Sequence, residues 1–549
     1  MKRKNINTLI RASSVANYMM DDCLADYFKQ SYDDDNKSAQ YIMEQGNQFE
    51  SELIKIIMKD HIVYTPINGD MKYNETIDAM IKGYDIIYQG YLCDYNRNIG
   101  GSPDLIIKST YFNKLFPNTI IPHGESNINN VVQPYYYIIV DIKHSTIHLT
   151  TTNHIKNNKR IPAYKAQLYI YTSILNNLQN VTINRAYIWG KDYTPEYDFL
   201  NTVGIIDYDT IDKKYKTDAM KAVEWLLLLA DKEQTINPIS NILLYPNMKQ
   251  PTYKHDKKQI NNSVHDITTL WNCGINHRMK AFNKNIYSYD DVMAEDMGMS
   301  KKKAKIVNNI ISINTQNDDM IRITNKHAMQ HAMQHTNKQP KTLQIFIDFE
   351  GFSEKLKCKI NNGIIQQLDK YYIYMIGIGH NINNMWKYKS FILPQTSEEQ
   401  QNNLFKSLFY YLRNLQRQTK TDFIQFYHWS HYEMIFFNKL TKNINLCISD
   451  NNYKFIDLCA IYQSSVVIKD CFNFKLKNIA SALYRNNLIK TCYEANDCMD
   501  GLDATIMALQ LYDNNKVKNN PVLLSIEKYN ETDCKVLYEL YELLEKLSL

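Results

Sequence analysis

The sequence predicts an α/β protein of two or three domains. Its 549 residues exceed what one hydrophobic core normally serves, and an apolar share of 44% is enough to build more than one core. Helix-like and strand-like periodicities alternate within two stretches of the chain, residues 1–244 and 342–549. We expect a small helical module at residues 245–320 and a linker at residues 321–341 between these two domains.

The first stretch is expected to fold in the order helix, three strands, helix, strand. Amphipathic helices open it, and apolar runs of strand length follow. The expected helices are residues 14–30, 38–59 and 163–178, and the expected strands are residues 84–92, 103–107, 136–142 and 181–189.

The last stretch opens with three strands that form a meander, followed by a helix, a strand and further helices. A mixed sheet with flanking helices is the expected result. The expected strands are residues 343–350, 371–379, 385–393 and 423–429, and the first expected helix is residues 398–418.

The predicted linker contains the tandem repeat HAMQHAMQH, which places His327, His331 and His335 one helical turn apart. Histidines at this spacing could bind a metal ion. A duplicated run within a linker is the preferred interpretation, because such metal sites are rare.

Composition restricts the class of protein. The ten cysteines contain no CxxC pair, which indicates reduced thiols rather than a zinc or disulfide framework. The apolar runs fall short of the roughly 20 residues that a membrane span requires. We therefore expect an intracellular, cytoplasmic protein, or one of a viral replication compartment, since the abundance of Asn, Ile, Lys and Tyr suits an AT-rich viral or bacterial genome. With a net charge of +5, any site for a polyanion must be a local patch.

Acidic residues lie at the ends of two predicted strands in the first stretch. Asp104 begins one strand, and Asp141 and Lys143 end a later one. Adjacent strands would bring these side chains together. Paired carboxylates suit a divalent cation that acts on a phosphodiester, and a nearby lysine can position the nucleophile. Taken alone, each residue is more often a turn residue or a solvated strand end.

Two further motifs complete this set. Residues 46–50 (Gly-Asn-Gln-Phe-Glu) lie on the preceding helix and residues 167–171 (Gln-Leu-Tyr-Ile-Tyr) on the following one. Together with Gly-Ser-Pro-Asp at 101–104 and Asp-Ile-Lys at 141–143, this order resembles the RecB-like branch of the PD-(D/E)XK nucleases. The resemblance implies a restriction-endonuclease-like αβββαβ core, with Glu50, Asp104 and Asp141 as metal ligands, Lys143 as a catalytic residue, and Gln167 and Tyr171 supporting the site.

Two features depart from that family. The spacer from Asp104 to Asp141 is longer than usual, and its polar insert at residues 113–130 is expected to be a surface loop or a flap that faces DNA. Some relatives carry a four-cysteine iron–sulfur site. No cysteine lies between Cys93 and Cys273, so no such cluster is expected here.

A second set of acids lies in the last stretch. Asp348 and Glu350 fall on one face of its first strand, because side chains alternate along a strand. Buried acids on one face are costly unless they bind something, although a solvated strand end would also explain the pair. Glu433 follows a later strand, and Tyr529 and Asp533 lie one turn apart on the last helix.

This pattern resembles the DEDD exonucleases of the RNase H-like superfamily, in the branch often fused to RecB-like domains in bacteria and viruses. The resemblance implies an RNase H-like mixed sheet and two divalent ions, and it implies that Tyr529 orients or deprotonates the attacking water. Glu433 departs from the pattern, since many of these exonucleases have Asp there. We interpret Asp457 as structural. The implied metal ligands are Asp348, Glu350, Glu433 and Asp533.

Several basic residues are candidates for contacts with phosphate. Residues 266–292 in the helical stretch resemble a helix-hairpin-helix unit, which binds backbone phosphate, although packing alone could explain the pattern. The candidate nucleic-acid-binding residues are Lys156, Lys159, Arg160, Lys301, Lys302, Lys303, Lys475 and Lys477.

The sequence therefore predicts a nuclease that depends on magnesium or manganese and acts on DNA in repair, recombination or end processing, with RNA left open as a second substrate. A helicase or another repair or replication protein is the expected protein partner, and no membrane is involved. Two alternatives stay open. In the first, only one domain cuts and the other holds nucleic acid; in the second, the chain is an interaction protein without catalysis.

Overall fold

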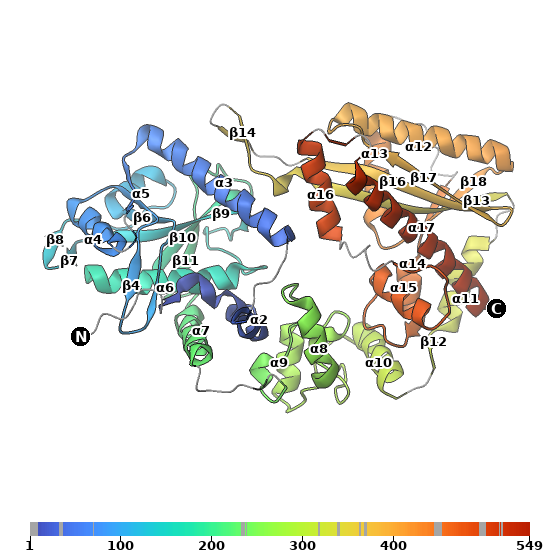
Figure 1. Ribbon diagram of the computed structural model, residues 1–549, viewed down its shortest axis with the longest axis horizontal. Coiled ribbons are helices and arrows are strands. Elements are labelled where there is room, and N and C mark those ends of the chain that lie inside the picture. The colour runs from blue at the N-terminus through green and yellow to red at the C-terminus, as the bar shows by residue number, and fades with distance from the viewer. Residues whose placement is uncertain are drawn as a thin grey trace. The chain divides into compact units, whose positions relative to one another are not determined.

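The computed structural model describes residues 9–31, 37–67, 69, 71–231, 237, 239–316, 319–337, 341–361, 364–366, 370–443, 453–493, 501–514, 516–517 and 520–549. The chain divides into two compact units. Unit 1 comprises Met1–Ser263 and Lys355–Leu368, and unit 2 comprises Val264–Glu354 and Asp369–Leu549. Both units combine β-sheets with helices, so the predicted α/β class is confirmed (Figure 1).

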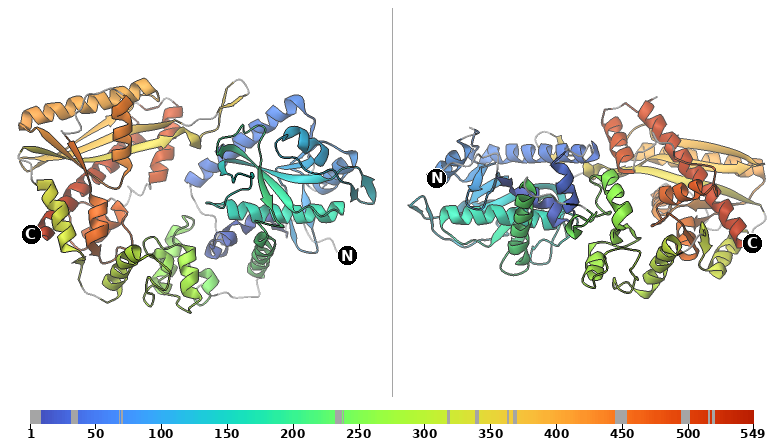
Figure 2. Two further views of the ribbon diagram at one scale, coloured as in Figure 1. Left: turned by 180° about the vertical axis from the view of Figure 1, so that it is seen from behind. Right: turned by 60° about the horizontal axis from the view of Figure 1, so that its bottom comes forward.

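Unit 1 is built around a six-stranded mixed sheet with the order β11-β10-β9-β6-β3-β2. Its central strand β9 (Tyr137–His148) is antiparallel to β6 (Leu105–Lys108) and parallel to β10 (Arg185–Thr194). Helices α3 (Lys37–Asp60) and α6 (Ile161–Gln179) pack against β9 from opposite sides of the sheet (Figures 1 and 2). The first half of β9 is therefore buried on both faces, which explains its continuous apolar run.

Shorter elements surround this sheet. The remaining helices of unit 1 are α1 (Ala16–Met19), α2 (Cys23–Lys29), α4 (Lys72–Lys82), α5 (Ser109–Leu115), α7 (Lys214–Ala230) and nearly all of α8 (Lys254–Val264), and the remaining strands are β1 (Ile10–Arg11), β2 (Val63–Tyr64), β3 (Ile86–Tyr88), β4 (Leu92–Asp94), β5 (Ile99–Gly101), β7 (Ser126–Ile128), β8 (Val131–Gln133) and β11 (Gly204–Asp207).

Two predicted elements of unit 1 are interrupted. The expected strand 84–92 is two strands, β3 and β4, because the chain turns at Gln89, whose φ is 49°. The turn brings Gly90 against the sheet, where a Cβ atom would lie 2.9 Å from Ile106 Cδ1. The expected helix 14–30 breaks in the same way at Asp21, whose φ is 53°.

The segment Lys355–Leu368 belongs to unit 1 although its neighbours in the sequence belong to unit 2. It contains the strands β14 (Lys359–Asn361) and β15 (Ile364–Gln366), which pair with each other. The backbone N–H of Cys358 donates to Gln45 Oε1 at 2.8 Å, and the Lys357 carbonyl oxygen lies 3.2 Å from His144 Nε2. Unit 1 is thus assembled from two separate parts of the chain.

Unit 2 contains a five-stranded mixed sheet with the order β17-β16-β13-β18-β19. Its central strand β13 (Thr342–Ser353) is antiparallel to β16 (Tyr371–Ile382) and parallel to β18 (Phe423–His428). β17 (Met385–Ile392) and β19 (Tyr453–Asp457) form the edges. The predicted meander and fourth strand are confirmed, and β19 is an additional strand that the sequence did not predict.

Helices cover both faces of this sheet. On β13, Phe349 contacts Phe405 of α12 (Glu398–Thr419), whereas Phe346 contacts Tyr538 of α17 (Pro521–Ser548). Odd-numbered and even-numbered side chains of a strand point to opposite faces, so α12 and α17 lie on opposite sides of the sheet. The even-numbered face, which carries Asp348 and Glu350, is therefore the face that α17 covers.

The start of α17 is fixed by its sequence. The Asn520 side chain accepts a hydrogen bond from the backbone N–H of Val522 at 2.9 Å, and Pro521 occupies the first helical position. Both residue types are favoured at these positions, because Asn satisfies an unpaired N–H and Pro has none to satisfy. This cap sets the register of every later residue of α17.

The predicted helical module at 245–320 is divided in the structure. α8 lies in unit 1 apart from its last residue, while α9 (Ile275–Phe282) and α10 (Lys301–Thr315) lie in unit 2. Val307 of α10 belongs to the same buried cluster as Leu537 of α17. The other elements of unit 2 are α11 (Lys326–Asn337), α13 (Tyr432–Asn443), α14 (Leu458–Ser465), α15 (Leu476–Arg485), α16 (Gly501–Asp513), β12 (Ile321–Ile323) and β20 (Val466–Ile468).

The segment 321–341, expected to be a linker, is folded. β12 pairs with β20, and α11 packs against α14 and α17. The repeat spacing of four residues places Met329 and Met333 on the buried face of α11, whereas His327 and His331 are exposed. The repeat is therefore an amphipathic pattern, and the linker prediction is wrong because buried methionines hold this helix in the core of unit 2.

Neither a disulfide nor a membrane-spanning helix occurs in the part of the chain that the structure describes. The described cysteines are free thiols, and Cys447 and Cys498 lie outside the described residues. Each described helix is too short or too polar to cross a bilayer.

Replacing Met333 by Ala should lower the free energy of unfolding by about 2–5 kcal/mol, because it removes buried methylene groups and leaves a cavity. The exposed neighbour His331 provides the matched control, and its replacement by Ala should change the free energy by less than about 0.5 kcal/mol. Urea unfolding measures both. Equal effects of the two substitutions would show that the methionine face is not the packed one.

Candidate functional site

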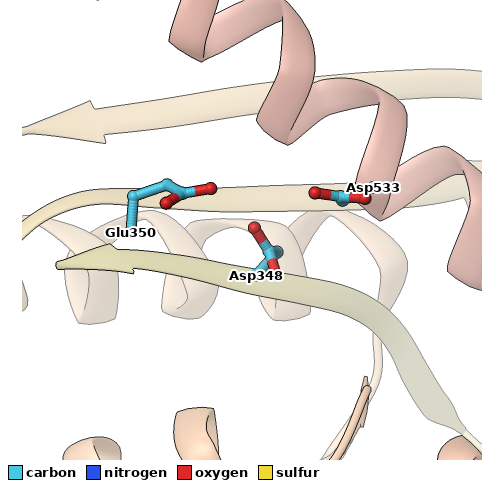
Figure 3. Close-up of side chains that lie close together, drawn as sticks. All are labelled: Asp348, Glu350 and Asp533. Carbon is cyan, nitrogen blue, oxygen red and sulfur yellow. The ribbon is translucent and has the colours of Figure 1, made fainter. Parts of the chain in front are cut away.

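Three carboxylates meet above the sheet of unit 2. Asp348 and Glu350 project from β13, and Asp533 projects from α17 toward them (Figure 3). One carboxylate oxygen from each lies within 4.8 Å of the others. We call these three residues the acid cluster. Residues that are about 180 positions apart in the sequence are thus brought together by the packing of α17 on the even-numbered face of β13.

The acid cluster is electrostatically unfavourable by itself. Burial, together with the charges of Asp533 and Glu433, raises the pKa of Glu350 to about 8. Burial also raises the pKa of Asp533 to about 7, although a hydrogen bond from Tyr493 and the charge of Lys477 act in the opposite direction. Burial, followed by the charges of Asp533, Glu350 and Glu433, raises the pKa of Asp348. A bound cation would relieve this repulsion.

Glu433 lies beside the acid cluster but is not one of the three closest carboxylates. It is buried in the first turn of α13, and its charge raises the pKa of Glu350. Its Oε2 lies 3.6 Å from Nδ1 of the buried His428. Among the described residues this buried oxygen accepts no hydrogen bond. Such an oxygen has capacity left for a ligand.

The donor set fits a hard divalent cation. All the groups of the acid cluster are carboxylate oxygens, which magnesium and manganese prefer, and no described cysteine or histidine lies within the cluster. The residues that would hold such ions are Asp348, Glu350 and Asp533, with Glu433 beside them.

Two tyrosines approach Asp533. The Tyr493 hydroxyl donates a hydrogen bond to Asp533 Oδ1, and a hydrogen bond from Tyr529 also lowers the pKa of this acid. The sequence predicted Tyr529 from its position one turn before Asp533. It did not predict Tyr493, which precedes Asp533 by 40 positions and belongs to no recognisable motif.

Asn530 is a second residue that the sequence analysis missed. This fully buried side chain of α17 donates from Nδ2 to Asp348 Oδ2 at 2.6 Å and accepts at Oδ1 from the Tyr388 hydroxyl at 2.9 Å. A Cβ atom at Gly377 would lie 1.6 Å from Asn530 Oδ1, so only glycine leaves room for it. Its one signal in the sequence is a polar side chain at a core position of the helix, one turn before Asp533.

Asp457 has the structural role that the sequence predicted. It caps α14, where its Oδ1 accepts from the backbone N–H of Ala460 at 3.2 Å. The same oxygen accepts from the backbone N–H of Ser430 at 3.0 Å, which fixes the turn before α13.

In unit 1, the Lys143 ammonium lies between two of the predicted acids. Lys143 Nζ contacts Asp141 and lies 3.8 Å from Asp104 Oδ2. The same Asp104 oxygen accepts from the backbone N–H of Ile142 at 2.7 Å. Burial and the charge of Asp104 raise the pKa of Asp141, whereas the charge of Lys143 lowers it. Oδ1 of the buried Asp141 accepts no hydrogen bond among the described residues.

Glu50 of α3 faces the same region. Its Oε1 accepts from Gln89 Nε2 at 2.9 Å, and burial and the charge of Asp104 raise its pKa. On α6, Tyr171 donates to the Ser102 carbonyl at 3.3 Å, and Gln167 forms a hydrogen bond with Tyr171. The motif residues on α3, immediately before β6, on β9 and on α6 are thus neighbours in unit 1.

The candidate phosphate contacts are mostly solvent-exposed. Lys156, Lys159 and Arg160 precede α6, and Lys301, Lys302 and Lys303 form the first turn of α10. Lys475 is exposed at the start of α15, whereas Lys477 is half-buried near Asp533.

The model of a family described as the RNase H superfamily matches residues 362–545. The C-terminal part of the chain is therefore RNase H-like, which indicates a nuclease-type hydrolase of nucleic acid. The match includes Glu433, Tyr529 and Asp533 but begins after Asp348 and Glu350, which only the structure places in this site. A search of curated proteins finds no match for this chain.

The raised pKa values predict that unit 2, without metal, loses stability as the pH rises. Folded Glu350 and Asp533 retain protons up to about pH 8 and about pH 7, whereas the unfolded chain releases them near pH 4. The stabilisation is therefore complete below about pH 4 and is lost as the pH rises through these folded values. Unfolding in the presence of a chelator, followed across this range, measures the effect.

The variant Glu350→Gln should unfold with a weaker pH dependence than the parent, and the exposed Glu399→Gln should leave that dependence unchanged. A parent protein whose stability did not fall between about pH 5 and about pH 8 would contradict the crowding of these acids.

Asn530→Ala should weaken the binding of Mn²⁺ to unit 2 by about 10–100-fold, because Asp348 loses the group that orients it. Gly377→Ala should have a similar effect by displacing Asn530. Calorimetric titration measures this in a chain whose Asp104 and Asp141 are both replaced by Asn, so that the signal comes from unit 2. Asn403→Ala, at an exposed position of α12, serves as the control. Unchanged affinity in both variants would remove Asn530 from the site.

Proposed function

We propose that this chain is a divalent-metal-dependent nuclease that hydrolyses phosphodiester bonds of DNA. The observation that carries the proposal is the acid cluster, in which Asp348, Glu350 and Asp533 crowd their carboxylates within 4.8 Å of one another. The match of the C-terminal part to the RNase H superfamily supports it, since that fold surrounds the cluster.

The chain's own residues have separate tasks at this site. Magnesium or manganese, when bound, supplies positive charge at the scissile phosphate and a water of lowered pKa. Asp348 is held in one orientation by Asn530, and Asp533 is held by Tyr493. Tyr529 would orient the attacking water, because its hydroxyl lies at Asp533. Fixed carboxylates need no reorganisation during the reaction, which lowers its barrier.

Unit 1 is proposed to hold a second nuclease site of the RecB-like type. The contacts of Lys143 with Asp141 and Asp104 support this, as does Oδ1 of Asp141, which accepts no hydrogen bond among the described residues. Lys143 would stabilise the charge that develops on the nucleophile, and Glu50, Asp104 and Asp141 would hold the cation.

The positions of the exposed cations support a polyanionic substrate. Lys301, Lys302 and Lys303 lie at the N-terminal end of α10, where the helix dipole disfavours positive charge, and no acid in that turn offsets them. The negative charge of a phosphate backbone would offset the positive charge of these lysines. Lys156, Lys159 and Arg160 would act in the same way before α6. We further propose that the site in unit 2 trims DNA from 3′ ends. The chain would act in repair or end processing beside a helicase.

One observation favours a second candidate function. Glu433 is not among the three closest carboxylates, so unit 2 could hold nucleic acid while only unit 1 cuts it. Single substitutions at each site distinguish this scaffold from the chain with two active sites.

Lys143→Ala and Asp348→Ala should each remove one of two activities. On end-labelled single-stranded DNA with Mg²⁺, Asp348→Ala should reduce stepwise trimming from the 3′ end by more than about a hundredfold, because the loss of a ligand removes charge stabilisation at the phosphate. Lys143→Ala should spare trimming and abolish the remaining cleavage. The double variant should be inactive.

Duplex DNA and RNA of the same sequence, with and without a chelator, provide the substrate and metal controls. If Asp348→Ala kept full activity and Lys143→Ala lost all activity, the second candidate function would be favoured, in which unit 2 only holds nucleic acid. Cleavage that survived in the double variant or in the chelator would contradict both.

A further inference from the structure

The proposed nuclease site of unit 2 needs one more positive charge when a phosphodiester is bound. The acid cluster and Glu433 carry four negative charges when ionised, which two divalent ions would balance. A phosphodiester adds one negative charge, which the two divalent ions and four carboxylates leave unneutralised. A further cation beside the acids would lower the cost of placing the phosphate there. This inference rests on the proposed function.

Lys477 is a cation in that position. It lies in the first turn of α15 and is half-buried, and its charge lowers the pKa of Asp533, which places the ammonium near the acid cluster. Lys475, two residues earlier, is exposed.

Two aromatic rings hold the Lys477 ammonium. Its Nζ lies 5.1 Å from the centre of the Tyr493 ring and 5.5 Å from that of the Tyr529 ring, both within the range of cation–π attraction. The two ring centres are 5.7 Å apart. The lysine side chain has four rotatable bonds. Because contact with two rings already restricts their rotation, less conformational entropy is lost when Lys477 binds a ligand.

The same two tyrosines contact Asp533 through their hydroxyl groups. Each ring therefore connects the ammonium to a carboxylate of the acid cluster. This arrangement keeps a positive charge beside the metal ligands.

We propose that Lys477 binds a non-bridging oxygen of the phosphodiester at the unit 2 site, and that Tyr493 is the positioning residue that holds its ammonium there. The ligand is the backbone of a single nucleic-acid strand. Tyr493 acts in two ways: its ring orients Lys477, and its hydroxyl orients Asp533.

A purely structural lysine would behave differently. If Lys477 served only to neutralise Asp533, its removal would strengthen metal binding at the acid cluster and leave the affinity for nucleic acid and its salt dependence unchanged. A phosphate-binding lysine contributes a released counterion instead, which salt titration counts.

The test uses the full chain with Lys143→Ala, which restricts activity to unit 2, and compares it with the same chain carrying Lys477→Met. Methionine keeps an unbranched stem against the rings and removes the charge. Binding of a fluorescein-labelled oligothymidylate is followed by anisotropy over a series of KCl concentrations, with Ca²⁺ in place of Mg²⁺. Lys406→Met, at an exposed position of α12, is the control.

We expect Lys477→Met to weaken binding about tenfold and to reduce the slope of log K against log salt by about 0.7, the value for one phosphate of a single strand. With Mg²⁺, KM should rise by a similar factor. Tyr493→Leu should weaken binding more than Tyr493→Phe does, because phenylalanine keeps the ring that orients Lys477 and loses only the hydroxyl that orients Asp533.

An unchanged slope in Lys477→Met, or tighter metal binding with unchanged DNA affinity, would overturn the inference. Equal loss in Tyr493→Leu and Tyr493→Phe would overturn the positioning role of the ring. A parent chain that bound the strand but did not cut it with Mg²⁺ would defeat the proposed function alone, and the slope would still decide the role of Lys477. A parent chain that did not bind would defeat both.

Discussion

The arrangement of unit 2 depends on one electrostatic constraint, the repulsion among carboxylates that the fold places in a poorly solvated space. β13 turns Asp348 and Glu350 to the face that α17 covers, and α17 adds Asp533. Each acid loses hydration and gains like-charged neighbours, and both effects raise its pKa. A fold that tolerates this needs rigid support and a source of positive charge.

The support comes from groups that contact single carboxylates. Asn530 holds Asp348 and is itself fixed by the Tyr388 hydroxyl, while Tyr493 holds Asp533. Gly377 supplies the space that Asn530 occupies. Unit 1 deals with a similar repulsion differently, because Lys143 lies two residues from Asp141 on the same strand and contacts it directly.

The sequence predicted those features that follow from local periodicity. Alternation along β13 placed Asp348 and Glu350 on one face, and the helical spacing placed Tyr529 near Asp533. It could not predict Tyr493 or Gly377, whose roles arise from contacts between elements far apart in the chain. In α11, the histidines of the repeat suggested a metal site or a linker, but the buried Met329 and Met333 determine the structure of this segment.

The most direct test of the account is anomalous X-ray diffraction from crystals of the full chain grown with Mn²⁺. We expect an anomalous peak about 2.1 Å from carboxylate oxygens of Asp348, Glu350 and Asp533, where a bound ion would offset the repulsion between them. An acid cluster that contained no manganese at saturating concentration, with its carboxyl groups hydrogen-bonded to one another, would contradict it.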